Sequence, residues 1–346
     1  MLSARGLDAM LLTGGVAIRY FTGFTSDECL VLASHRGVTL ITDFRYTIQA
    51  KAQTGGAVSV REVNRRPEQL SALRALLAEQ GCRKVGFEDA AMTVAAFEEF
   101  KDMPVSWTPF STEAGKLRLI KSQDEIEALA KAQQMADAAF AKLLERLHPG
   151  MTEQEAAAEL NYLCALQGSE GPSFDPIVGS GENGAMCHAI PGGRTLQKGD
   201  FVVFDFGCIY QGYHSDMTRT VAIGSADEEM RRVYAVTLEA QQTALSALKG
   251  GISGRALDRI ARKVIADAGY GECFGHGLGH GFGLEIHEPP RAGVGSEDVL
   301  LPGMTVTVEP GIYLPGKCGV RIEDCCVVTE TGCVNLVSTA KDLLIV

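Results

Sequence analysis

The chain has 346 residues, of which 46% are hydrophobic, and this length and composition predict a globular protein of about two domains. Its formal net charge of −11 and sequence pI of about 5.2 argue against a nucleic-acid partner, because no stripe of Lys and Arg could displace counterions from phosphates. The sequence has no apolar run near the ~18 residues of a membrane span and no signal-type segment at its start, so we expect a cytoplasmic protein without membrane contact.

The ten cysteines are scattered without a C-x-x-C pair or a regular spacing. We interpret them as small apolar side chains of a protein in a reducing compartment. Four of them offer an alternative zinc site, which we disfavour because adjacent cysteines rarely both bind one tetrahedral ion. Those four are Cys318, Cys325, Cys326 and Cys333.

Residues 1–112 are expected to form a first domain in which strands and helices alternate, as is typical of α/β proteins. Strands are predicted at residues 9–12, 29–33, 38–42 and 84–87, and helices at 45–53, 67–79 and 93–100. Residues 103–116 contain Pro, Ser, Thr and Gly without a clear period, and we interpret them as the linker between two domains.

Residues 113–346 form the second predicted domain. Two capping boxes, Ser122 with Glu125 and Thr152 with Glu155, mark the starts of two helices, which we expect to end near residues 148–150 and at 168. Further helices are predicted at residues 228–249 and 255–268, and strands at 201–206, 217–223, 304–308 and 320–328. Because helices and strands are grouped along the sequence rather than strictly alternating, we expect an α+β fold with an antiparallel sheet covered by helices on one face.

Asp205 and Asp216 lie in strand-like segments on either side of a predicted turn at residues 210–212. Their separation is odd, so a turn of even length would place both side chains on the same face of the two strands. Two carboxylates so close repel each other, and an unpaired charge inside the apolar run around Asp205 is costly. We therefore predict a cation between them, against the alternative of two solvated turn acids.

Three histidines, His276, His280 and His287, lie in the glycine-rich stretch GHGLGHGFGLEIH at residues 275–287. This is not the helical H-E-x-x-H zinc motif, because Glu does not follow His276 and each glycine would destabilise a helix by about 1 kcal/mol. An extended or looping segment is expected, in which His276 and His280 have the same parity. Any one of the three could instead be an ordinary hydrogen-bonded polar group.

Glu309, in TVEPGIY, and Glu323, in GVRIED, each lie at a predicted strand edge. Because their separation is even, a common face needs an odd-length loop or a bulge, for which the Pro-Gly pairs at residues 310–311 and 315–316 provide material. Taken separately, Glu309 could be a strand-end residue and Glu323 could be an ion-pair partner of Arg321.

Two further residues could take part in chemistry. His188 could donate a hydrogen bond to a substrate carbonyl or could simply terminate a loop. Arg321 could hold a carboxylate, or it could order the Glu323 strand by bridging another acid.

Together these carboxylates and imidazoles can hold two divalent cations, and the ligand types suit Mn, Co, Fe or Zn. Such a pair lowers the pKa of a shared water and polarises a carbonyl, so hydrolysis is the expected chemistry.

The motifs FDFG, SDMTRT, GHGFGLEIH, VEPG and RIED resemble the metallopeptidase family of the "pita-bread" fold, which includes methionine aminopeptidase, Xaa-Pro aminopeptidase and Xaa-Pro dipeptidase. The resemblance implies a pita-bread catalytic domain of antiparallel sheet covered by helices. It also implies two divalent ions, with Mn or Co favoured over Zn or Fe, and a bridging role for Asp216 and Glu323. The implied ligands are Asp205, Asp216, His280, Glu309 and Glu323, and the implied catalytic or substrate-facing residues are His188, His276, His287, Glu309 and Arg321.

The stretches IRYFTGF at residues 18–24 and LITDFRY at 40–46 resemble the smaller creatinase-like N-terminal domain of the proline-specific branch. In relatives this domain contributes to specificity and supports dimers or larger homo-oligomers. We therefore expect a homo-oligomeric Xaa-Pro aminopeptidase that acts on proline-containing peptides. The alternative is an Xaa-Pro dipeptidase, and a remote alternative is a peptide-binding scaffold of the same fold without metal activity.

Overall fold

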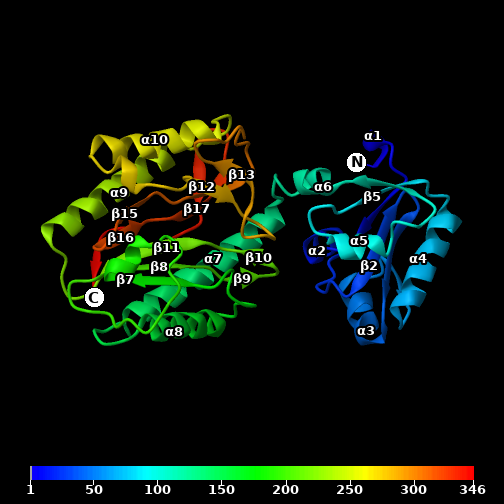
Figure 1. Ribbon diagram of the computed structural model, residues 1–346, viewed down its shortest axis with the longest axis horizontal. Helices are drawn as coiled ribbons and strands as arrows, with labels where there is room; N and C mark the ends of the chain where they lie inside the picture. Colours follow the sequence, from blue (N-terminus) through cyan, green and yellow to red (C-terminus); the bar gives the residue numbers. More distant parts are fainter. Residues whose placement is uncertain (1) are drawn as a thin grey trace. The chain divides into compact units, whose positions relative to one another are not determined.

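The computed structural model describes residues 2–346, and the chain divides into two compact units (Figure 1). The first unit extends to Arg118, and the second is Leu119–Val346. All ten cysteines are free thiols. Within the described residues, none of the helices combines the length and the apolarity needed to cross a membrane.

The N-terminal unit is built on a six-stranded sheet with the order β4-β3-β2-β1-β5-β6. β2 is antiparallel to β1 and β3, and the other neighbours are parallel. Leu11 and Leu12 of β1 belong to two different hydrophobic clusters, so both faces of the sheet are buried. The elements are α1 (Leu2–Arg5), β1 (Ala9–Leu12), α2 (Gly15–Thr22), β2 (Cys29–Ser34), β3 (Gly37–Thr42), α3 (Phe44–Gln53), β4 (Ser59–Glu62), α4 (Arg66–Gln80), β5 (Lys84–Phe87), α5 (Val94–Glu98), β6 (Ser106–Pro109) and α6 (Ser111–Leu117).

The segment interpreted as a linker is regular structure, so that prediction was wrong. β6 is the edge strand beside β5, and three of its four side chains are exposed. An exposed edge strand lacks the apolar run by which strands are recognised in a sequence. Phe110 and Ala114 pack into the N-terminal core, and the division of the chain therefore lies after Arg118 rather than after residue 112.

The C-terminal unit places its strands between two pairs of helices (Figure 1). α7 (Gln123–Leu144) and α8 (Glu153–Leu166) share one hydrophobic cluster with the sheet β19-β11-β8-β7, whereas α9 (Glu228–Ala247) and α10 (Gly254–Asp267) share another with β14 to β17. The strands are β7 (Ile177–Ser180), β8 (Phe201–Phe206), β9 (Ile209–Tyr210), β10 (Tyr213–His214), β11 (Met217–Ala222), β12 (Gly279–Gly281), β13 (Glu288–Ala292), β14 (Thr305–Val308), β15 (Gly311–Leu314), β16 (Cys318–Arg321), β17 (Asp324–Val328), β18 (Cys333–Asn335) and β19 (Leu344–Ile345), and the 3-10 turns are η1 (Gly181–Ala185) and η2 (Gly271–Cys273).

The predicted capping boxes of the first two of these helices are confirmed. The hydroxyl of Ser122 accepts from the Glu125 backbone N–H, and the Glu125 carboxylate accepts from the Ser122 backbone N–H. Thr152 and Glu155 make the same reciprocal pair at the start of α8. Each box satisfies backbone donors that the first helical turn leaves without partners, so the start of each helix is well defined.

The hairpin that carries Asp205 and Asp216 keeps one register from its base to its tip. Asp205 pairs with Thr218 in β8–β11, and the β9–β10 pair at the tip continues the same offset. The connecting turn has two residues, 211 and 212, with φ of 48° and 73°. This even-length turn places the two aspartates diagonally on one face, as predicted.

A second hairpin places Glu309 opposite Glu323. Val308 pairs with Asp324 in β14–β17, and the β15–β16 ladder continues with the same offset. The tip between β15 and β16 has three residues, 315–317. The odd-length loop that a common face requires is therefore present.

The prediction of one strand over residues 320–328 was wrong, because the chain leaves β16 after Arg321 and enters β17 at Asp324, in a different sheet. Between them the Glu323 backbone N–H donates to the Thr218 carbonyl of β11 at 3.1 Å. The interruption couples the two hairpins and turns the Glu323 side chain toward the aspartates.

Candidate metal centre

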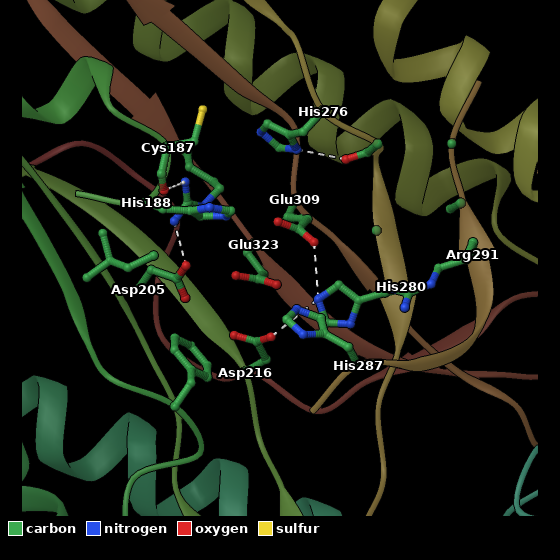
Figure 2. Close-up of a pocket in the computed structure, with 17 residues that line it drawn as sticks. Cys187, His188, Asp205, Asp216, His276, His280, His287, Arg291, Glu309 and Glu323 are labelled. Atoms are coloured by element: carbon green, nitrogen blue, oxygen red, sulfur yellow. Dashed lines mark hydrogen bonds and ion pairs between the residues drawn. The ribbon is translucent and has the colours of Figure 1, made fainter. Parts of the chain in front are cut away.

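Four of the predicted ligands converge in the middle of the C-terminal unit (Figure 2). His280 Nε2 lies 3.4 Å from Glu309 Oε1 and 3.6 Å from Asp216 Oδ2. Donor atoms of Asp216, His280 and Glu323 all lie within 4.8 Å of one another. Side chains from the two hairpins and from β12 therefore share one small space.

Asp205 adjoins this cluster and is held by Arg321. The Arg321 guanidinium donates through Nη2 to Asp205 Oδ2 and through Nε to Thr218 Oγ1 at 3.1 Å. The Thr218 hydroxyl in turn donates to Glu323 Oε2 at 2.7 Å. Arg321 is 3% exposed, so it forms part of the wall of the cluster. Of the two alternatives for this residue, the geometry favours the bridging of another acid.

The glycines around His280 explain how its imidazole reaches the carboxylates. A Cβ on Gly279 would lie 2.0 Å from the Thr307 carbonyl oxygen, and one on Gly281 would lie 2.4 Å from the Pro289 carbonyl oxygen. Only glycine allows this close approach of backbones. The Gly281 carbonyl lies 3.1 Å from His280 Nδ1 and accepts its proton, which leaves the lone pair of Nε2 directed at the acids.

Burial and mutual repulsion disturb the pKa values of these groups. Burial, followed by the charges of Glu323 and Asp205, raises the pKa of Asp216. Burial also raises the pKa of Glu323, and it raises the pKa of Glu309 to about 8. The pKa of His280 falls to about 3, again mainly because of burial, so its imidazole is neutral at physiological pH.

The cluster fits divalent cations. Asp205 Oδ1 and Glu323 Oε1 are buried and have no hydrogen-bond partner among residues 2–346, which is a costly arrangement unless a cation takes up these lone pairs. Four carboxylates share this space with the buried guanidinium of Arg321, and dications would compensate the remaining negative charge. Carboxylate oxygens with one imidazole are ligands that Mn, Co, Fe and Zn accept.

The other three predicted histidines line the same pocket, which has a volume of about 410 Å³. His287 packs edge-on against His280, with ring centroids 4.3 Å apart. His276 Nε2 lies 2.8 Å from the Tyr313 hydroxyl, and this hydroxyl accepts a hydrogen bond from Arg321 Nη1 at 2.8 Å. Figure 2 shows His188 on the side of the pocket opposite His280 and His287.

Sequence reasoning missed three hydroxyl groups that hold this constellation together. Tyr313 bridges His276 and Arg321, Thr218 bridges Arg321 and Glu323, and the Thr307 hydroxyl donates to Glu309 Oε1 at 3.1 Å. Thr218 and Thr307 belong to motifs around predicted ligands. Hydroxyl side chains are common in strands, however, and the sequence does not distinguish a bridging threonine from any other.

Comparisons with known proteins identify the family. The profile described as Metallopeptidase family M24 matches residues 127–330, and the Creatinase/Prolidase N-terminal domain matches residues 1–120. The chain belongs to metallopeptidase family M24. The predicted pita-bread catalytic domain and the creatinase-like N-terminal domain are thereby confirmed, and divalent metal ions are the cofactors of this family.

Named relatives and solved structures cover the whole chain. The Xaa-Pro dipeptidase of Pyrococcus horikoshii is 35% identical over 342 residues, which are 98% of this chain and 95% of that protein. An Xaa-Pro dipeptidase from Bacillus anthracis has a TM-score of 0.96 at 40% identity and covers 100% of this chain and 97% of its own. An X-Pro aminopeptidase from Thermotoga maritima has a TM-score of 0.95 at 36% identity, with 100% of both chains covered. The M24 chain is accordingly a metallo-exopeptidase.

Proposed function

We propose that this M24 peptidase is an Xaa-Pro dipeptidase that hydrolyses the bond before a C-terminal proline. Most of the named relatives are Xaa-Pro dipeptidases, which supports this alternative better than the aminopeptidase expected from the sequence. A bond before proline lacks an N–H and carries a rigid ring, so enzymes that bind an extended backbone handle it poorly and a dedicated site is required.

One feature of the pocket supports a substrate of two residues. Arg291 lines the pocket and is exposed, and among residues 2–346 no hydrogen bond or ion pair engages its guanidinium (Figure 2). Arg321 is occupied by Asp205 and Tyr313. The available cation for the terminal carboxylate of a two-residue substrate is therefore Arg291.

The ligands of the proposed metal pair are Asp205, Asp216, His280, Glu309 and Glu323, and we favour Mn or Co as its occupants. When bound, such a pair would supply Lewis acidity that lowers the pKa of a water and polarises the peptide carbonyl. Glu309 lines the pocket and would take and return the proton of the attacking water. His188 or His287, which line opposite sides of the pocket, donates a hydrogen bond to the charge that develops on the carbonyl oxygen.

Substrate length tests the proposal. Purified enzyme loaded with Mn or Co is assayed on Xaa-Pro, on Xaa-Pro amide and on Xaa-Pro-Yaa-Zaa. We expect hydrolysis of Xaa-Pro alone, because the amide and the longer peptide lack a carboxylate at the proline. Rapid cleavage of the longer peptide would instead establish the aminopeptidase, and a protein that binds metal but cleaves none of the three would support the scaffold alternative.

Arg291→Met gives a second, independent test. The loss of a charge-assisted hydrogen bond is worth about 1.5–3 kcal/mol, so KM for Xaa-Pro should rise by about 10- to 100-fold. The matched control is Arg255→Met, which removes an exposed arginine from α10 and should leave KM unchanged. An unaltered KM in Arg291→Met would remove this residue from substrate binding.

Two further parts of the proposal concern the protein outside the pocket. We propose a homodimer or larger homo-oligomer, which light scattering of the purified protein tests through its mass. We also propose a cytoplasmic location, which the ten free thiols support because a reducing compartment keeps them unpaired. Fractionation of the producing cells checks the location.

A further inference from the structure

The loop that carries His188 is closed by a single buried carboxylate. Glu153 is the first residue of α8, and its side chain is fully buried. Glu153 Oε1 accepts from the Ser180 backbone N–H at 2.8 Å and from the Ser180 hydroxyl at 2.7 Å. Its other oxygen, Oε2, accepts from the Gly192 backbone N–H at 3.2 Å. One carboxylate therefore holds both ends of the segment between Ser180 and Gly192.

The same carboxylate also reaches into this segment. The Asn183 side-chain amide lies 3.0 Å from Glu153 Oε1 and 3.2 Å from Oε2, so its N–H groups donate to Glu153. The backbone at the start of α8 makes two further hydrogen bonds to the end of the loop, from the Glu153 N–H to the Arg194 carbonyl and from the Gln154 N–H to the Gly192 carbonyl. A buried carboxylate that accepts this number of hydrogen bonds is well compensated for its burial.

The middle of the loop is held against the metal centre. Arg321 Nη1 donates to the Cys187 carbonyl at 3.1 Å, directly before His188. The backbones of Gly184 and Gly319 approach so closely that a Cβ on Gly319 would lie 1.8 Å from the Gly184 carbonyl oxygen. His188 itself is exposed toward the pocket and lies four residues before Gly192, the nearest contact of the Glu153 side chain along the chain. Its location is therefore set by the anchors of the loop.

We propose that Glu153 is the positioning residue for His188. It does not contact the pocket, and it acts by fixing both ends of the loop so that the imidazole stays where the carbonyl charge develops. This inference rests on the proposed function only for the role of His188, because the anchoring of the loop can be measured without any substrate.

The test is a double-mutant cycle of Glu153→Gln and His188→Ala on the metal-loaded enzyme with an Xaa-Pro substrate. Glutamine has the same shape but offers one acceptor oxygen, so its amide nitrogen would face donors of Asn183 or Gly192. The loss of one donor to a developing oxyanion lowers kcat by about 10²-fold, and we expect Glu153→Gln to lower kcat by about 10- to 100-fold with KM changed less than about threefold. In the His188→Ala background the same substitution should change kcat less than about twofold.

Glu155→Gln is the matched control. It makes the same substitution two residues along α8, within the capping box of Thr152, and it does not touch the loop. We expect normal kcat from it. If Glu153→Gln does not fold, Asn183→Ala removes one anchor without altering Glu153 and should lower kcat in the same direction.

Amide hydrogen exchange of the metal-free protein separates this inference from the proposed function. Glu153→Gln should speed exchange in residues 180–192 and leave the rest of α8 unchanged, whether or not the enzyme hydrolyses Xaa-Pro. Folded Glu153→Gln and Asn183→Ala proteins with wild-type exchange in this loop would overturn the proposal. So would a loss of kcat that is equally large in the presence and absence of His188.

Discussion

Asp324→Asn should strongly destabilise the C-terminal unit. Asp324 is fully buried, directly after Glu323, and binds the buried Arg219 at 2.8 Å and Lys341 at 2.6 Å. Side-chain amides of Gln241 and Asn335 donate to the same carboxylate at 2.9 and 2.8 Å. Burial raises the pKa of Asp324, but the charges of Arg219 and Lys341 outweigh it and hold the pKa below its usual range.

The magnitude follows from the charge that the substitution leaves behind. Asparagine keeps the shape but not the charge, so the guanidinium of Arg219, only 2% exposed, would remain buried without its counter-ion. Breaking one side of a buried pair in this way costs about 3–5 kcal/mol. With an unfolding slope of roughly 3 kcal/mol per molar urea, the midpoint should fall by about 1–2 M.

Urea unfolding followed by far-ultraviolet circular dichroism measures this shift. Asp342→Asn is the matched control, because it makes the same change at an exposed position of the same C-terminal segment and should move the midpoint little. A midpoint shift for Asp324→Asn no larger than that of the control would refute the assignment of Asp324 as the counter-ion of Arg219.

Three more predictions concern the centre and its surroundings. Lys121→Met should lower the free energy of unfolding by about 3–5 kcal/mol, because Lys121 and Glu288 form a buried ion pair at 2.5 Å. In urea titrations, the double variant with Glu288→Met should lose less stability than the sum of the two single variants. Asp216→Ala should abolish both bound metal and turnover, which metal analysis and an activity assay check together, and full activity without metal would contradict the assigned ligands. The pKa of Glu309 in the metal-free protein is raised to about 8, so metal binding should release protons and should weaken as the pH falls below 8. His280 has a pKa of about 3, so protons should not compete with the metal for its imidazole near neutral pH. Calorimetry in buffers of different ionisation enthalpy measures the proton release.

The long helices and several buried strands could be predicted from the sequence because their signals are local. The capping boxes at Ser122 and Thr152 have both partners within four residues, and the apolar runs of β1 and β8 are buried along their full length. α2 and β4 were missed for the opposite reason. The N-cap residue of α2 is Gly14, which makes no side-chain cap, and β4 has no fully buried residue.

In the candidate metal centre, too, only the features that depend on local sequence could be predicted. Parity along the chain is a local property, so it predicted that Asp205 and Asp216 share a face and that Glu309 and Glu323 need an odd-length loop. The break after Arg321 depends instead on a backbone bond from Glu323 to β11, which is a tertiary contact. Neighbouring residues in the sequence do not indicate such a tertiary contact. The hydroxyl bridges of the centre are tertiary contacts too, so they could not be predicted either.

The fixed strand registers of the two hairpins that carry the four acids restrict how this protein can vary in length. The facing of each pair of acids depends on the number of residues at a tip, which is two in one hairpin and three in the other. A one-residue insertion at either tip that shifted the strand pairing would turn one carboxylate to the far side of its sheet, whereas an insertion of two would preserve the facing. Natural or engineered lengthening of these tips should therefore be tolerated in steps of two, and loops grafted for new purposes should obey the same rule.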